Sequence, residues 1–171
     1  MIQIYTGDGK GKTTAATGLT VRALGAGMRV FFAQFIKNGS SSEILFLREH
    51  GGENFTYFTL GSGRFIIGTP APDDCRRAAE TLAALKQALV SGQYDLVVAD
   101  EILGSLQAKL FTPDDLSELL ETAGEFPETE LILTGRNAPE SAVELAGLVS
   151  EVRCVKHYYM LGRPPKKGIE F

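Results

Sequence analysis

The sequence predicts an α/β fold, with a mostly parallel sheet of about six strands and helices on both of its faces. Short β-rich runs alternate with longer helical segments, which is typical of a parallel sheet with crossover helices. Several of the short runs are almost continuously hydrophobic, as central strands are when helices cover both faces. We expect strands at residues 2–5, 29–35, 55–59, 96–100, 130–134 and 152–156, and helices at residues 12–24, 42–50, 74–90, 113–122 and 140–148.

Local sequence supports these helices in turn. Residues 12–24 are rich in alanine and follow a glycine-rich turn directly. Within residues 74–90, apolar side chains recur at helical spacing and predict a face that packs on the core, at Ala78, Ala79, Leu82, Leu85 and Leu89. Before residues 113–122, Thr112 offers a hydroxyl cap to a helix that begins with a proline. Gly124 is expected to end that helix in a left-handed conformation.

The composition indicates one globular domain, residues 1–171, with 44% hydrophobic and 22% charged residues. A formal net charge of −4 argues against a nucleic-acid partner. No apolar run approaches the roughly 20 residues that span a bilayer, and no secretion signal precedes the first strand, so we expect a cytoplasmic protein with no membrane partner. Cys75 and Cys154 are distant in sequence and have no histidines nearby, so we expect reduced thiols that hold no metal.

A glycine-rich turn at residues 6–14, TGDGKGKTT, lies between the first expected strand and the first expected helix. Glycines let backbone N–H groups converge on phosphate oxygens, and a helix N-terminus adds positive potential. Lys12 can reach the phosphates, and the Thr13 hydroxyl is placed to bind Mg²⁺. The first position is irregular, because the usual pattern has Gly where this chain has Thr6. The turn predicts a nucleotide triphosphate site made by Gly7, Asp8, Gly9, Lys10, Gly11, Lys12, Thr13 and Thr14.

Charged residues at the expected strand ends extend this site. The apolar run 96–99 leads into Asp100 and Glu101, and a strand-end carboxylate beside a phosphate loop can hold Mg²⁺. For these two carboxylates alone, a strand end that reaches solvent remains the alternative. Arg136 follows another strand and could contact the nucleotide or a second substrate. Arg22 of the first helix is a further candidate for nucleotide binding, with a plain surface position as the alternative.

Six segments together resemble one enzyme family. They are residues 6–16 (TGDGKGKTTAA), 34–37 (QFIK), 98–102 (VADEI), 133–136 (LTGR), 155–157 (VKH) and 167–171 (KGIEF). In this order they make essentially the whole chain resemble the ATP:cob(I)alamin, or corrinoid, adenosyltransferases of the phosphate-loop type. Thr at the first position of the loop is a feature of that family, so the irregular Thr6 supports the resemblance.

The resemblance implies a RecA-like P-loop NTPase fold, usually in a homodimer. It implies transfer of the 5′-deoxyadenosyl group of ATP to Co(I) of a corrinoid, with release of triphosphate, in adenosylcobalamin biosynthesis or salvage. The corrinoid would be cob(I)yrinic acid a,c-diamide, cobinamide or cobalamin, and an electron donor would reduce its cobalt. Carried over by motif, Lys12, Thr13 and Glu101 are catalytic, with Thr13 and Glu101 as the Mg²⁺ ligands. Because Co(I) is itself the nucleophile, no catalytic Ser, Cys or His is expected.

One segment departs from the family pattern. The family typically has Gly-x-Gly-Phe-Thr-Trp after the third strand, whereas residues 61–66 of this chain read GSGRFI and the whole chain contains no Trp. Arg64 thus replaces the first aromatic residue, and Phe65 could compensate from the next position. The departure concerns the corrinoid and leaves the nucleotide half of the site intact. A P-loop kinase or ATPase, or a non-catalytic nucleotide- or corrinoid-binding relative, remains the alternative.

Overall fold

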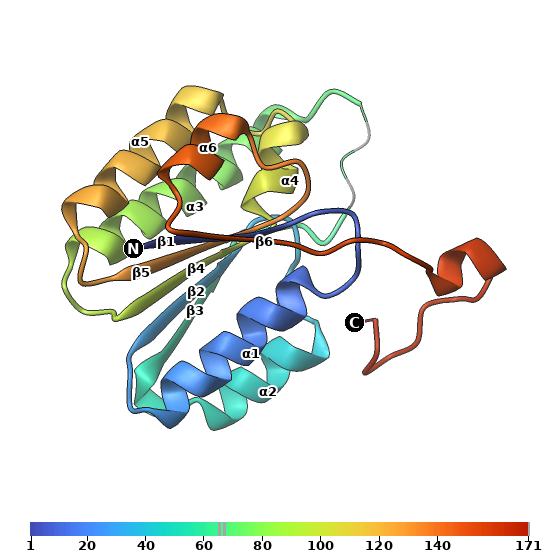
Figure 1. Ribbon diagram of the computed structural model, residues 1–171, viewed down its shortest axis with the longest axis horizontal. Helices are drawn as coiled ribbons and strands as arrows, with labels where there is room; N and C mark the ends of the chain where they lie inside the picture. Colours follow the sequence, from blue (N-terminus) through green and yellow to red (C-terminus); the bar gives the residue numbers. More distant parts are fainter. Residues whose placement is uncertain (65, 67, 171) are drawn as a thin grey trace.

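The computed structural model, in which residues 1–64, 66 and 68–170 are described, has a six-stranded sheet between two layers of helices (Figure 1). Its strands are β1 (Ile2–Thr6), β2 (Val30–Gln34), β3 (Phe55–Thr59), β4 (Leu96–Asp100), β5 (Glu130–Thr134) and β6 (Leu148–Glu151). The order across the sheet is β3-β2-β4-β5-β1-β6, and these neighbours pair in parallel. The predicted fold class is therefore confirmed.

Helices cover both faces of this sheet. They are α1 (Lys12–Gly25), α2 (Ser42–His50), α3 (Pro72–Val90), α4 (Ile102–Gln107), α5 (Pro113–Glu125) and α6 (Glu140–Leu145), with 3₁₀ turns η1 (Gly52–Asn54) and η2 (Tyr158–Leu161). The pair α1 and α2 lies on one face, and α3, α4, α5 and α6 lie on the other (Figure 1). Among the helices that the structure describes, none combines the length and hydropathy of a membrane span.

The central strands separate two hydrophobic cores. In β4, Val97 and Ala99 face the core with α3 and α5, whereas Leu96 and Val98 face the core with α1 and α2. This alternation follows from the two-residue period of a strand. Both β2 and β4 are buried along their whole length, which explains their continuous hydrophobic runs. The sheet therefore holds the carboxyl ends of its middle strands in fixed positions.

The last strand was predicted in the wrong place. It spans Leu148–Glu151, before the predicted residues 152–156, and α6 ends at Leu145 rather than at residue 148. Pairing with β1 sets these bounds, because the register runs from Gln3 opposite Leu148 to Thr6 opposite Glu151. All four residues of β6 are exposed, so the strand lacks the hydrophobic run on which the prediction depended.

Two smaller predictions about helices were also wrong, and one helix was not predicted. The short helix α4 was missed. Gly124 does not end α5, which continues to Glu125. Ala79 is exposed on α3, although Ala78, Leu82, Leu85 and Leu89 are buried as expected. Ala88 is buried as well, so the core face of α3 excludes Ala79 and includes Ala88 near its end.

The cap of α5 is present as predicted and makes a stability test. The Asp115 backbone N–H donates to Thr112 Oγ1 at 3.3 Å, and the Thr112 backbone N–H donates to Asp115 Oδ2 at 2.7 Å. We expect Thr112→Ala to lower the free energy of unfolding by about 1 kcal/mol, because the Asp115 N–H at the start of the helix loses its acceptor, the Thr112 hydroxyl. Urea denaturation followed by circular dichroism measures this change.

A matched control lies in the same helix. The exposed Thr122 hydroxyl only donates to the Glu118 carbonyl oxygen at 2.8 Å, so Thr122→Ala should change the free energy of unfolding by less than about 0.5 kcal/mol. If both variants lost the same free energy of unfolding, the side chain of Thr112 would not stabilise the helix as a cap.

Candidate functional site

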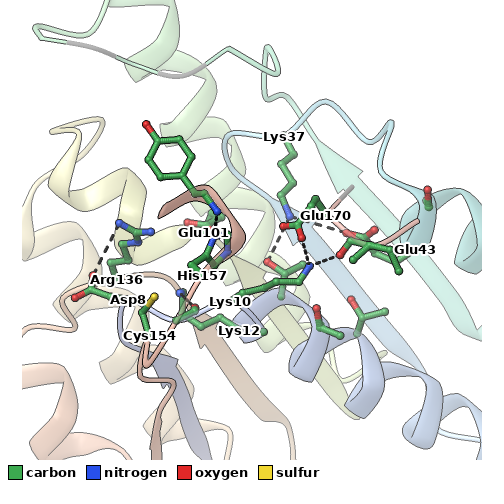
Figure 2. Close-up of a pocket in the computed structure, with 18 of the residues that line it drawn as sticks. Asp8, Lys10, Lys12, Lys37, Glu43, Glu101, Arg136, Cys154, His157 and Glu170 are labelled. Carbon is green, nitrogen blue, oxygen red and sulfur yellow. Dashed lines mark hydrogen bonds and ion pairs between the residues drawn. The ribbon is translucent and has the colours of Figure 1, made fainter. Parts of the chain in front are cut away.

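A cavity of about 1110 Å³ lies at the carboxyl edge of the sheet, beside the turn between β1 and α1 (Figure 2). Its walls come from this turn, from the ends of other strands and from the chain after β6. Most of the predicted site residues line it: Asp8, Gly9, Lys10, Gly11, Lys12, Thr13, Thr14, Glu101 and Arg136. Arg22 is not among the lining residues, because it lies in the last turn of α1, about 15 Å along the helix from Lys12.

Glycine is required in the phosphate loop, residues 6–14, because the backbone after β6 runs against it. Gly7 has a φ of 99°, and a Cβ atom there would lie 2.5 Å from the carbonyl oxygen of Val152. A Cβ atom on Gly9 would lie 2.7 Å from the same oxygen, to which the Gly9 N–H donates at 2.7 Å. The loop is thus held by the main chain that passes behind it.

The N-terminus of α1 is open to an anion. Gly11 precedes the helix with a φ of 130°, no side chain caps the helix start, and its first turn contains no acidic residue. The first N–H groups of a helix need partners and carry partial positive charge. Thr17 of the same helix lines the cavity, and its buried hydroxyl oxygen has no hydrogen-bond partner among the described residues. Both features suit a polar, anionic ligand.

The side chain of Lys12 folds back against the preceding residues of the phosphate loop. Its side chain is buried, and its Nζ donates to the carbonyl oxygens of Gly7 at 2.7 Å and Gly9 at 2.8 Å. Burial lowers the pKa of the Lys12 ammonium, and the negative charge of Glu101 opposes that shift. The ammonium therefore lies at the base of the phosphate loop, where an anion would meet it.

Asp100 is fully buried and connects the loop to the sheet. Its Oδ1 accepts hydrogen bonds from the Thr13 hydroxyl at 2.8 Å and the Thr134 hydroxyl at 2.7 Å. Its Oδ2 accepts one from Gln34 Nε2 at 2.8 Å. Sequence reasoning did not assign roles to Thr134 and Gln34. The available signal was a polar residue at the carboxyl end of a hydrophobic strand, in β5 and in β2.

Glu101 turns away from this network into the cavity. Its φ of 62° is left-handed and starts α4, and its backbone N–H donates to Thr134 Oγ1 at 2.9 Å. Burial raises the pKa of the Glu101 carboxyl, and the neighbouring Asp100 adds to the increase. Lys37 and Lys12 act in the opposite direction. A cation in the cavity would likewise favour the ionised carboxylate.

Arg136 lies across the cavity from Glu43 (Figure 2). Its Nη1 is 3.9 Å from Asp8 Oδ1, and both side chains are largely exposed, so the pair contributes little to stability. The loop that carries Arg136 is held by Thr6, whose hydroxyl accepts from the Ala138 N–H at 3.2 Å. The irregular first residue of the phosphate loop thus connects it to the loop after β5.

The chain after β6, residues 152–170, forms an arm that leaves the sheet and turns back toward α1 (Figure 1). Lys10 Nζ lies 3.3 Å from Glu170 Oε1 and also donates to the Ile169 carbonyl oxygen. The segments VKH and KGIEF, noted in the sequence, both lie in this arm, and His157 of the first segment lines the cavity. Arm residues that line the cavity are Cys154, His157, Tyr159, Met160, Gly168, Ile169 and Glu170.

The segment after β3 borders a separate small hollow. Arg64 and Ile66 line it together with Phe35 and Arg77. Phe65, which could replace the missing aromatic residue, lies outside the described residues. Cys75 and Cys154 are free cysteines.

Known proteins resemble this chain in sequence and in fold. The family model for ATP:corrinoid adenosyltransferase BtuR/CobO/CobP matches residues 1–171. The corrinoid adenosyltransferase of Escherichia coli (strain K12) is 34% identical over 173 residues, which cover 100% of this chain and 85% of that protein. Corrinoid adenosyltransferase CobA of Salmonella typhimurium (strain LT2) is 35% identical over 179 residues, with coverage of 100% and 85%.

Solved structures agree on the fold. The flagellar accessory protein FlaH of Methanocaldococcus jannaschii superposes with a TM-score of 0.54 at 15% identity, covering 88% of this chain and 69% of that one. The RadB recombinase gives a TM-score of 0.54 at 18% identity, covering 88% and 72%. At such identities the likeness concerns the fold alone, and it confirms the expected RecA-like P-loop fold.

The hydrogen bonds of Thr134 make a prediction about stability. Thr134→Val keeps the shape of the side chain but removes a donor to Asp100 and the acceptor of the Glu101 N–H. We expect a loss of about 1–3 kcal/mol in the free energy of unfolding, because a buried N–H is left unpaired. Denaturant titration measures this loss.

Thr20→Val is the matched control. Thr20 is also fully buried, but its hydroxyl donates only to the Ala16 carbonyl oxygen within α1, at 2.9 Å. The Ala16 carbonyl oxygen keeps its backbone partner within α1 when the hydroxyl is removed. Thr20→Val should therefore lower the free energy of unfolding by less than about 1 kcal/mol. Losses of the same size in both variants would contradict a special role for Thr134.

Proposed function

The chain belongs to the ATP:corrinoid adenosyltransferase family, and from this membership we propose that it moves the 5′-deoxyadenosyl group of ATP to Co(I) of a corrinoid. The electron pair of Co(I) forms a Co–C bond at C5′ of the ribose. The C5′–O bond breaks, and its electron pair leaves on the triphosphate. The proposed corrinoid is cob(I)yrinic acid a,c-diamide, cobinamide or cobalamin, in adenosylcobalamin biosynthesis or salvage, and a separate electron donor supplies Co(I).

The observation that carries this proposal is the phosphate loop, in which Lys12 donates to the carbonyl oxygens of Gly7 and Gly9. The family model that matches this loop also matches the rest of the chain. The departing triphosphate gains negative charge as the C5′–O bond breaks. Lys12 and the open N-terminus of α1 lie where they can stabilise that charge, and Lys10 can add to them once it leaves Glu170. The remaining task of the protein is to hold C5′ in line with the cobalt.

We also propose that Mg²⁺ accompanies the triphosphate. Thr13 Oγ1 and the Glu101 carboxylate, both on the cavity wall, would bind it, and Asp100 would hold the Thr13 hydroxyl in place. Hard oxygen donors suit this ion, which is commonly held by one or two carboxylates and substrate phosphates. Within the described part of the chain, no three His, Cys, Asp or Glu side chains form a metal cluster, so phosphate oxygens would complete the set. Bound Mg²⁺ would neutralise charge on the leaving group.

A homodimer in the cytoplasm forms part of the same proposal. Support for a partner subunit comes from apolar side chains that the arm exposes: Val155, Tyr158, Tyr159, Met160 and Leu161. Exposed apolar residues gathered on one segment are typical of a surface that a partner covers. Such a partner would also exclude water from the reduced cobalt.

The products distinguish this reaction from phosphoryl transfer. Incubation with ATP and a chemically reduced corrinoid, without oxygen, should give a light-sensitive adenosyl-corrinoid and intact triphosphate in equal amounts. Absorbance spectroscopy follows the corrinoid, and anion-exchange chromatography identifies the phosphate product. ADP and phosphate would instead indicate a kinase or ATPase, and corrinoid binding without Co–C bond formation would indicate a non-catalytic relative.

Lys12→Ala tests the proposed role of the loop. The variant should lose about 10²-fold in turnover and bind ATP more weakly, because it lacks the charge that meets the triphosphate. Isothermal titration calorimetry measures ATP binding, and the product assay measures turnover. Lys86→Ala is the control, since Lys86 pairs with Glu118 between α3 and α5, at 2.8 Å. Full activity of the Lys12 variant would refute the assignment.

A further inference from the structure

Lys37 is a cation of the cavity to which the proposed reaction gives no role. It follows β2 in the QFIK segment and lines the cavity. Its Nζ lies 3.4 Å from Thr13 Oγ1, 3.5 Å from Asp100 Oδ2 and 3.9 Å from Glu43 Oε1. The ammonium group of Lys37 thus lies among oxygen atoms from α1, β4 and α2. Figure 2 shows Lys37 above the phosphate loop.

The charge of Asp100 explains why an ammonium group lies there. A fully buried carboxylate is costly unless it is both hydrogen-bonded and paired with a positive charge. Thr13, Thr134 and Gln34 supply hydrogen bonds but no charge. Lys37 supplies the positive charge to the carboxylate oxygen that Gln34 also contacts.

The hydroxyl that Lys37 contacts is the one proposed to bind Mg²⁺. Thr13 donates its hydrogen to Asp100, so only the lone pairs of its oxygen can meet a cation. Lys37 donates to that oxygen and uses one of these lone pairs. A divalent ion on the same oxygen would lie close to the ammonium group of Lys37, whose side chain is 36% exposed. Like charges at this separation repel each other even where solvent partly screens them. The two cations therefore compete.

We propose that Lys37 holds the metal position in the nucleotide-free protein and is displaced when a divalent cation binds to Thr13. Glu43 remains within reach of the displaced ammonium group. The negative charge of the triphosphate favours replacement of the Lys37 ammonium group by the divalent cation. The cation therefore enters together with the nucleotide. Without the nucleotide, the site binds the cation only weakly. Lys37 is thus a positioning residue for the metal–nucleotide complex. The inference rests on the proposed function, from which it takes the ion at Thr13.

Mn²⁺ binding to the nucleotide-free protein tests the competition. The paramagnetic resonance signal of free Mn²⁺ gives the dissociation constant. Lys37→Gln should bind Mn²⁺ at least about tenfold more tightly than the wild type, because the competing charge is gone. Lys37→Arg keeps the charge and should bind as weakly as the wild type. Equal affinities of the wild type and Lys37→Gln, or tight binding by Lys37→Arg, would overturn the proposal.

Lys86→Gln is the matched control for net charge. It also removes one positive charge, but its partner is Glu118, on the α3–α5 side of the sheet. Its Mn²⁺ affinity should equal that of the wild type. A tenfold increase in this variant as well would assign the effect to overall charge and refute a local competition.

A second measurement uses the wild type, in case Lys37→Gln does not fold. Lysine labelled with ¹³C at Cε gives one nuclear magnetic resonance signal for Lys37, identified by its loss in Lys37→Arg. This signal should shift in proportion to Mg²⁺ occupancy as the ammonium group leaves Thr13 and Asp100. An unchanged signal at full occupancy would show that the two cations do not exclude each other.

Failure of this inference and failure of the proposed function give different results. With inorganic triphosphate present, proton relaxation by Mn²⁺ reports the ternary complex in the wild type and in Lys37→Gln. If that complex forms and adenosyl-corrinoid is produced, but the nucleotide-free affinities are equal, only the role of Lys37 fails. If no adenosyl-corrinoid is produced, the proposed function fails. If no ternary complex forms in either protein, the metal position and the inference fail together.

Discussion

The rest of the site depends on the hydrogen bonds made by the buried carboxylate of Asp100. It joins β4 to α1 through Thr13, to β5 through Thr134 and to β2 through Gln34. Burial of a carboxylate is costly, so each of these hydrogen bonds is strongly favoured over an alternative packing. Three strand ends and the first helix are thereby held in one arrangement. The start of α1 and Glu101 take their positions from that arrangement.

The middle of the sheet could be predicted from the sequence, but its edge could not. In β2 and β4 every residue is buried, so burial on both faces produces a hydrophobic run that identifies the strand. In β6 every residue is exposed, and pairing with β1 alone fixes the strand. The helix α4 was missed because it spans only six residues. It directly follows Glu101, whose left-handed backbone is uncommon for residues other than glycine.

The site shows the same limit. Residues 7–14 are contiguous, so their spacing identifies a phosphate loop directly. Thr134 and Gln34 are single residues that meet Asp100 only after the sheet has formed, and no local pattern marks them. The family resemblance accounted for Thr6 in the sequence, but its hydrogen bond with the Ala138 N–H could be seen only in the structure. Arg22 was placed near the nucleotide by its helix alone, although three turns separate it from the loop.

The contact between the phosphate loop and the start of the arm determines where the nucleotide-binding fold ends. Val152 follows the last strand, yet its N–H donates to the Thr6 carbonyl oxygen at 2.8 Å and its carbonyl oxygen accepts from Gly9 at 2.7 Å. A chain cut after Glu151 would keep six strands but lose the backbone that supports the loop from behind. A chain cut after Arg153 would keep it. The smallest unit able to shape the loop therefore extends two residues past the sheet, and domain boundaries drawn at the last strand would divide it.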